Sequence, residues 1–178
     1  MEKRFEKNIN IAITGPESTG KTTLTRILAE HFKGGEISEY ARDYIFNLNR
    51  AYTISDLVHI AKYQIDSYKN LFPGESGIVF FDTWLIITKI WFQEVYSSCP
   101  DWVVSAIDTY KMEFYLVCAP DIEWHEDPVR ENGGEKRLKL FDLYIEEIQK
   151  LNVPYKIIYG EGQQRSENAI KAVEDYMQ

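Results

Sequence analysis

The chain has 178 residues, of which 44% are hydrophobic and 27% charged, and its 28 acidic and 20 basic residues give a formal net charge of -8. This length fits one domain of roughly 100–200 residues and allows a full core without disulfides or metals. The composition excludes a wholly disordered chain and a collagen-like fibre, and the acidic balance argues against a general nucleic-acid binder, which needs a basic face.

The first elements are read from hydrophobic periodicity. Residues 9–14 are mostly β-branched and predict a buried strand. Apolar side chains at three- and four-residue steps predict a helix at 21–32, and a short strand follows at 36–38. Thr53 opens a Thr-x-x-Asp capping box, and the apolar face behind it, which runs to Phe72, predicts a second helix.

The middle of the chain repeats this alternation. An apolar run at 78–81 that meets Asp82 predicts a strand buried on both faces. Helical spacing predicts helices at 83–96 and 101–110, and a buried strand follows at 114–119.

The last third begins with a polar stretch. Residues 123–135 predict a loop, because they contain Pro128 and a Gly-Gly pair. The helix that follows is expected to bury Leu138, Phe141, Ile145 and Ile148. A last strand is predicted at 155–159, before a terminal helix around 169–176.

Strands that alternate with helices indicate a parallel sheet covered on both faces. We therefore predict an α/β fold with three layers (α/β/α), a central parallel sheet of about five strands and a single domain over residues 1–178. Ligands of such sheets bind beyond the carboxyl ends of the strands. Gly15, Glu39 and Asp82 each follow a predicted strand, so we expect them to share one rim.

Residues 15–22 read Gly-Pro-Glu-Ser-Thr-Gly-Lys-Thr and match the phosphate-loop pattern G-x-x-x-x-G-K-[ST]. Between a strand and a helix, such a loop turns backbone N–H groups towards a polyphosphate. Lys21 can reach the β- and γ-phosphates, and the Thr22 hydroxyl can ligate Mg²⁺. Pro16 has no N–H, so the donors must come from residues 17–22. The pattern predicts nucleotide binding, with ATP and Mg²⁺ as cofactors.

Two carboxylates at the same rim are candidates for the chemistry. Asp82 can hold Mg²⁺ or accept the proton of an attacking hydroxyl, or it can cap the following helix. Glu39 can bind or deprotonate a substrate hydroxyl, or it can belong to an exposed helix start. Arg42 can orient a substrate or phosphate. Tyr40 and Trp84 can stack on a planar ring, with core packing as the alternative.

The guanine-reading pattern Asn-Lys-x-Asp is absent, which leaves a small kinase of nucleosides, nucleotides or similar metabolites. Such enzymes need a lid that brings arginines to the γ-phosphate and excludes water. The polar stretch at about 123–137 fits a lid, because it carries Arg130 and Arg137 and has Gly133-Gly134 as a hinge. An ordinary surface loop would have the same composition.

Four stretches occur in a specific order: residues 14–22, Glu-Tyr-Ala-Arg-Asp at 39–43, Phe-Asp-Thr at 81–83, and Glu123-Trp124 ahead of Asp127 and Arg130. Together they resemble the ribosylnicotinamide kinase domain of the NadR-type bacterial NAD-biosynthesis proteins. The resemblance runs from about residue 9 to residue 176. The Glu-Tyr-x-Arg and Asp-Thr elements are its more specific part.

The resemblance implies a nucleoside-kinase-like P-loop fold that transfers the ATP γ-phosphate to the 5′-hydroxyl of nicotinamide riboside. It implies that ATP is held by Gly15, Glu17, Ser18, Thr19, Gly20, Lys21, Thr22 and Thr23. The implied metal residues are Thr22 and Asp82, and the implied substrate residues are Glu39, Tyr40, Arg42 and Trp84. The catalytic residues would be Lys21, Asp82, Glu39 and Arg130, the last from the lid.

The chain departs from the family at two points. Trp84 stands where the family often has a second acidic residue, so contacts there can differ. No His-x-Gly-His is present, so adenylylation is not expected. Two alternatives stay open: a P-loop kinase of another nucleoside or metabolite, and a nucleotide-binding sensor without turnover.

The remaining features predict a cytoplasmic protein. Two cysteines are too few for a disulfide framework, and the three histidines form no cluster. The charged N-terminus is not a signal peptide, and no stretch approaches the ~18 apolar residues of a membrane span. We expect a small nucleoside-like substrate and neither nucleic-acid nor membrane partners. The oligomeric state cannot be read from the sequence.

Overall fold

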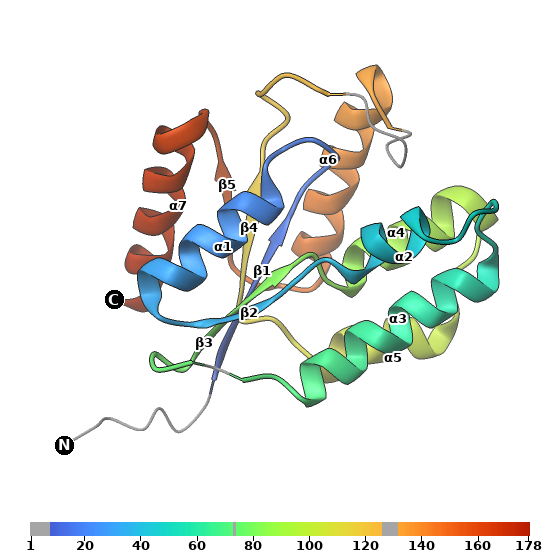
Figure 1. Cartoon of the computed structure of the whole chain (residues 1–178), viewed down its shortest axis with the longest axis horizontal. Helices are drawn as coiled ribbons and strands as arrows, with labels where there is room; N and C mark the ends of the chain where they lie inside the picture. The colour runs from blue at the N-terminus through green and yellow to red at the C-terminus, as the bar shows by residue number, and fades with distance from the viewer. Residues whose placement is uncertain (1–7, 73, 126–131) are drawn as a thin grey trace.

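The computed structural model describes residues 8–72, 74–125 and 132–178, and a five-stranded parallel sheet lies at its centre (Figure 1). The strands are β1 (Ile9–Thr14), β2 (Gly35–Ile37), β3 (Ile78–Asp82), β4 (Phe114–Cys118) and β5 (Tyr155–Ile158). Their order is β2-β3-β1-β4-β5, and every neighbouring pair is parallel. The predicted sheet is confirmed.

Helices form the two outer layers. In the described residues they are α1 (Lys21–Phe32), α2 (Tyr40–Phe46), α3 (Ile54–Lys69), α4 (Leu85–Tyr96), α5 (Asp101–Thr109), α6 (Gly134–Lys150) and α7 (Gly162–Met177). Helices α1 and α7 cover one face of the sheet, and α3 to α6 cover the other (Figure 1). The three-layer prediction is confirmed. No helix in the described ranges has the length and apolarity that a membrane crossing requires.

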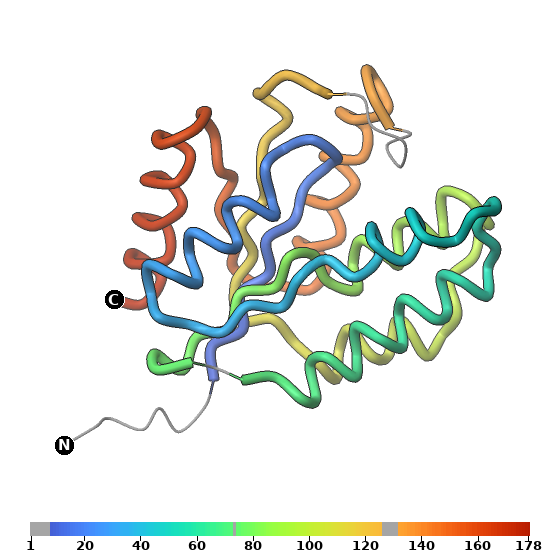
Figure 2. Tube along the Cα trace, viewed as in Figure 1, coloured from blue at the N-terminus to red at the C-terminus, as the bar shows by residue number. Residues whose placement is uncertain are grey.

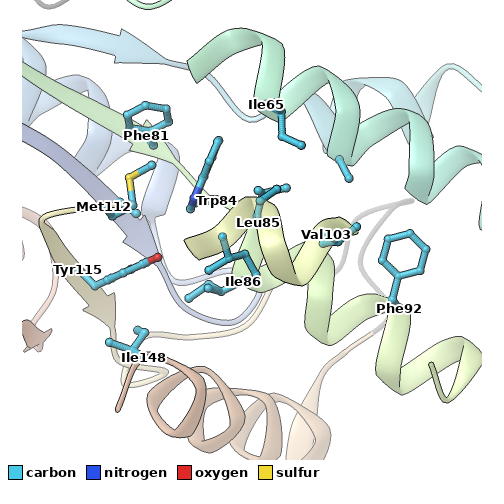
Figure 3. Packing of buried hydrophobic residues seen from close by; sticks show 14 of the residues in the cluster. Ile65, Phe81, Trp84, Leu85, Ile86, Phe92, Val103, Met112, Tyr115 and Ile148 are labelled. Carbon is cyan, nitrogen blue, oxygen red and sulfur yellow. The ribbon is translucent and has the colours of Figure 1, made fainter. Parts of the chain in front are cut away.

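Both faces of the sheet are buried, because alternate strand residues enter different cores. Ile11 and Ile13 of β1 pack with α1 and α7, whereas Ala12 between them packs on the other side. The larger core contains Phe81, Trp84 and Tyr115, as Figure 3 shows. This burial on both sides fixes the strand ends that carry the polar rim.

Three helical expectations were wrong in detail. The second predicted helix ends at Lys69, so Phe72 lies outside it and its side chain is 79% exposed. Of the face expected on α6, Ile148 is buried and Phe141 and Ile145 pack against the larger core, whereas Leu138 is 55% exposed. Leu140 and Tyr144, which were not expected, are also buried, so the covered face is wider than the one predicted and excludes Leu138. Helix α2 was not predicted as a full element.

Candidate active site

The phosphate-loop motif occupies the turn between β1 and α1, at the carboxyl edge of the sheet (Figure 2). Gly15 is required there: its φ is +134°, and a Cβ would lie 2.6 Å from the Cys118 carbonyl oxygen. The chain thus passes close over the end of β4. The edge also carries Asp82 at the end of β3 and Glu39 just after β2. The predicted shared rim is confirmed.

The carbonyl oxygens of residues 16–20 all accept hydrogen bonds. The Pro16 oxygen accepts the Thr19 hydroxyl and the Lys21 ammonium, both at 2.9 Å, and Gly20 accepts the Leu24 N–H at 3.0 Å. The three carbonyls between them accept hydrogen bonds from two buried arginines, Arg137 and Arg165.

The backbone N–H groups of the loop behave in the opposite way. Within the described ranges, no acceptor takes the N–H groups of residues 17–23. Residues 21–23 form the first turn of α1, where N–H groups have no acceptor within the helix, and the donors of residues 17–20 extend this run. Such a run of donors at a helix N-terminus suits an anion. The predicted phosphate cradle is compatible with this arrangement, and anion binding there stays a prediction.

Asp82 is the most buried charged group of the rim, with 2% of its surface exposed. Neither carboxylate oxygen has a partner at full hydrogen-bond geometry among the described residues, although the Thr22 hydroxyl lies close to the carboxylate. Burial raises the pKa of this carboxyl, while the nearby Thr22 hydroxyl and Lys21 ammonium oppose the rise. An enclosed carboxylate without partners is costly, and such groups concentrate at functional sites.

Glu39 is half-buried and lies close enough to Lys21 and Asp82 for each to affect its titration. Burial raises its pKa most, the Lys21 ammonium lowers it, and the Asp82 carboxylate raises it again. Arg42, one turn along α2, lowers the pKa of both carboxyls. The structure thus groups four of the predicted site residues around the loop.

The backbone after Asp82 turns sharply. Thr83 has φ of +71°, a left-handed conformation that is unusual for a β-branched residue and that occurs mainly where the surroundings enforce it. The turn delays the start of α4 to Leu85. It also sends Trp84 into the core, where it is 1% exposed and its ring centroid lies 5.3 Å from that of Phe81 (Figure 3).

A cleft opens beside Asp82 between β3, α2 and α3. Its lining residues are Ile37, Ser38, Tyr40, Tyr63, Gln64, Ser67, Phe81, Asp82, Thr83 and Trp84. Trp84 thus contributes to the cleft wall although it is almost wholly covered. Aromatic rings and small polar groups alternate in its lining, and the space between them is small.

Aromatic contacts join α2 to α3 along this cleft. The Tyr40 ring stacks on Tyr63 with centroids 3.6 Å apart, and its hydroxyl lies 2.8 Å from His59 Nε2. Tyr44 donates a 2.8 Å hydrogen bond to Asp56. Sequence reasoning missed Tyr63. The available signal was an aromatic residue four positions after His59, on a helix face outside the apolar stripe.

The predicted lid lies only partly within the described residues. Arg130 lies outside them. At the edges of the gap, Asn132 donates to the Glu17 carboxylate from its backbone (3.0 Å) and its side chain (2.6 Å), and the His125 N–H donates to Ser18 at 3.1 Å. The Glu17 side chain therefore contacts the lid segment.

The donor set suits Mg²⁺. The Thr22 hydroxyl and the unpartnered Asp82 oxygens are hard ligands of the type this ion prefers, and Mg²⁺ usually keeps several waters beside one or two carboxylates. No group of three or more His, Cys, Asp or Glu side chains able to hold a metal occurs within the described ranges. The residues fit a metal bound jointly with phosphates.

The chain is similar to several known proteins. The AAA domain family matches residues 10–165. The trifunctional NAD biosynthesis/regulator proteins NadR of Salmonella typhimurium and Escherichia coli are each 27% identical over 150 residues. Each match covers 82% of this chain and 37% of the relative, so the chain spans little more than a third of these relatives' length.

Solved structures extend the likeness. A NadR protein in complex with NR is 26% identical, with a TM-score of 0.82 over 95% of this chain and 51% of that one. A NadR protein in complex with NAD and AMP-PNP has a TM-score of 0.76 over 95% and 49% of the two chains. A thymidylate kinase from Ehrlichia chaffeensis, 14% identical, shares the fold, with a TM-score of 0.64 over 97% and 100%. The predicted nucleoside-kinase-like P-loop fold is confirmed.

Proposed function

The chain belongs to the AAA domain family, and from that premise we propose that it is an ATP- and Mg²⁺-dependent kinase that converts nicotinamide riboside to nicotinamide mononucleotide. A relative of high structural similarity is solved with NR (nicotinamide riboside), and another with an ATP analogue. Both are similar over nearly the whole of this chain.

The observation that carries the proposal is the buried Asp82 carboxylate beside a loop of N–H donors without acceptors. The donors suit the phosphates of ATP, and the carboxylate suits an acceptor hydroxyl or a metal ion. A phosphoryl-transfer enzyme needs both at one place, because its catalysis is largely positioning and charge neutralisation.

The residues take distinct roles in this scheme. The N–H groups of the loop and the Lys21 ammonium stabilise charge on the phosphates. Thr22 and Asp82 face the metal region, where Mg²⁺ would neutralise the β- and γ-oxygens. Asp82 is the preferred acceptor of the hydroxyl proton, with Glu39 second. Arg130 lies outside the described residues, and its role as the lid arginine stays a prediction.

The acceptor lies in the cleft between α2 and α3. Nicotinamide riboside carries a positively charged planar ring, which an aromatic face and nearby carboxylates both favour. Tyr40 and Tyr63 supply such faces, and Trp84 contributes from the cleft wall. We assign Glu39 and Arg42, at the start of α2, to the ribose side of the acceptor.

Two alternatives make different predictions. A kinase of another nucleoside would have the same loop and carboxylates but a different acceptor. A sensor would bind nucleotide without turnover, but it has no need of a buried carboxylate at the acceptor position.

A nucleoside panel decides among them. The purified chain is incubated with ATP, Mg²⁺ and each nucleoside, and phosphorylated product is detected by mass. Nicotinamide mononucleotide formed with matching ADP release supports the proposal. Product from another nucleoside alone favours the first alternative, and nucleotide binding without product from any nucleoside favours the sensor.

A further inference from the structure

Two buried arginines bind three successive carbonyl groups of the phosphate loop. Arg137 of α6 donates to Glu17 O at 3.1 Å and to Ser18 O at 2.8 Å, and Arg165 of α7 donates to Thr19 O at 3.1 Å. Their residues are 6% and 4% exposed. The loop is thus held from outside by two guanidinium groups that come from different layers of the fold.

Each arginine also binds the chain beyond the loop. Arg137 donates to Ile122 O at 2.9 Å, just before the lid segment. Arg165 donates to Gly160 O at 2.7 Å and Ala119 O at 3.2 Å, and it pairs with Asp121. The two side chains therefore connect the loop to the ends of β4 and β5 and to the start of the lid.

These contacts orient the donors that a phosphate would use. In a planar trans peptide the C=O and the N–H point in opposite directions, so a carbonyl held outward turns the next N–H inward. Ser18, with φ of +58°, needs such restraint, because a non-glycine residue rarely adopts this conformation unaided.

We propose that Arg137 and Arg165 are positioning residues that set the affinity of residues 15–22 for a polyphosphate. They act on the loop backbone and do not touch the ligand. This inference rests on the proposed ATP-dependent function. It assigns Arg137 a role different from that of a lid arginine that reaches the γ-phosphate, because its donors are turned to the loop carbonyls.

The test uses the full chain and the variants Arg137→Lys and Arg165→Lys, which keep the charge but lose the planar fork. Calorimetry measures the affinity for MgADP and for inorganic tripolyphosphate, and separately for nicotinamide riboside. A matched control is Lys89→Met. This change breaks the buried ion pair between Lys89 of α4 and Glu147 of α6, the helix that also carries Arg137. Circular dichroism and thermal unfolding accompany each variant.

We expect each arginine variant to bind MgADP and tripolyphosphate roughly tenfold or more weakly, because a hydrogen bond to a charged group is worth at least one such factor. Nicotinamide riboside affinity changes less than about twofold. Lys89→Met lowers the unfolding temperature but leaves polyphosphate affinity unchanged. This pattern separates positioning of the loop from general stability.

Four outcomes overturn the inference. Folded variants that bind polyphosphate as tightly as the wild type show that the arginines do not set its affinity. Equal weakening of all ligands, or failure of both variants to fold, shows a structural role alone. A wild-type chain that binds no MgADP removes the proposed function itself, and the inference with it.

Discussion

The Lys21 ammonium donates a hydrogen bond to the Pro16 carbonyl oxygen, 2.9 Å away, across the turn of its own loop. This bond holds the charge near the unpaired N–H groups of residues 17–23, before any phosphate is bound. It also leaves the lysine half-buried at the surface of the loop. The fold therefore does not depend on this side chain, although the proposed chemistry does.

We predict that Lys21→Ala lowers kcat about 10²–10³-fold, the usual cost of removing one preorganised group that stabilises developing charge. The far-ultraviolet circular dichroism spectrum should stay unchanged, because the change removes one hydrogen bond, to the Pro16 carbonyl, and the charge beside Glu39 and Asp82, but no core packing. Steady-state kinetics with purified protein measures the effect. Turnover within a few-fold of wild type would contradict the role of Lys21.

Asp82 yields a prediction in which activity and stability move in opposite directions. Burial raises its pKa above the unfolded value, so the folded chain holds this proton more tightly. The charged carboxylate therefore destabilises the fold at neutral pH, and the penalty disappears below the unfolded pKa of about 3.9. We expect Asp82→Asn to abolish most turnover yet raise the unfolding temperature at pH 7 in EDTA.

The expected rise is roughly 2–4 °C for each kcal/mol of relief in a chain of this size. Scanning calorimetry at several pH values measures it, and the gain should shrink towards pH 4. Asp108→Asn, an exposed aspartate of α5, serves as the control and should change little. A destabilised Asp82→Asn chain at neutral pH would show that the carboxylate has a partner that stabilises it.

The phosphate loop and the polar rim were predictable because local rules determine them. Residues 15–22 form a loop by their own pattern, and parallel strands bring their carboxyl ends to one edge whatever the details. Glu39 and Asp82 therefore lie near Lys21, as expected. Their roles in catalysis stay predictions.

The stacked Tyr40–Tyr63 pair and the arginine contacts to the phosphate loop depend on tertiary structure, so the sequence pattern gave little indication of either. Helix α2 has no buried residue, so it shows no apolar periodicity, and it is held by stacking of Tyr40 on Tyr63. Arg165 lies in a polar stretch of α7, where a buried arginine cannot be told from an exposed one by composition. Its contact with Thr19 bridges 146 positions of sequence.

The stacked pair of tyrosines should determine acceptor affinity. Tyr63 is 44% exposed and lines the cleft, so Tyr63→Ala should leave the core intact. We expect the KM for nicotinamide riboside to rise about three- to tenfold, the worth of one aromatic contact, while the KM for ATP stays constant. Tyr159→Ala, an exposed tyrosine after β5, is the control. Equal changes in both KM values would mean that the cleft is not the acceptor site.

Asp56 of α3 connects that helix to Tyr44 of α2 and gives the last prediction. Its carboxylate accepts two hydrogen bonds from Arg50 at 2.7 and 2.8 Å, one from the Thr53 N–H at 2.7 Å and one from the Tyr44 hydroxyl at 2.8 Å. The Arg50 guanidinium holds the pKa of Asp56 well below its usual range. Because the unfolded carboxyl titrates near pH 3.9, this carboxylate stabilises the fold at every pH above about 4.

We therefore expect Asp56→Asn to lower the unfolding temperature by a constant amount between pH 6 and pH 8, and the difference from wild type to narrow as pH falls below about 4. The KM for nicotinamide riboside should also rise, because an asparagine has one acceptor oxygen where Asp56 has two, so that Arg50, Thr53 and Tyr44 cannot all be satisfied and α2 loosens beside the cleft. Asp66→Asn, on an exposed face of the same helix, should change neither quantity. A stability difference that grows on acidification would reverse the sign of this argument and disprove it.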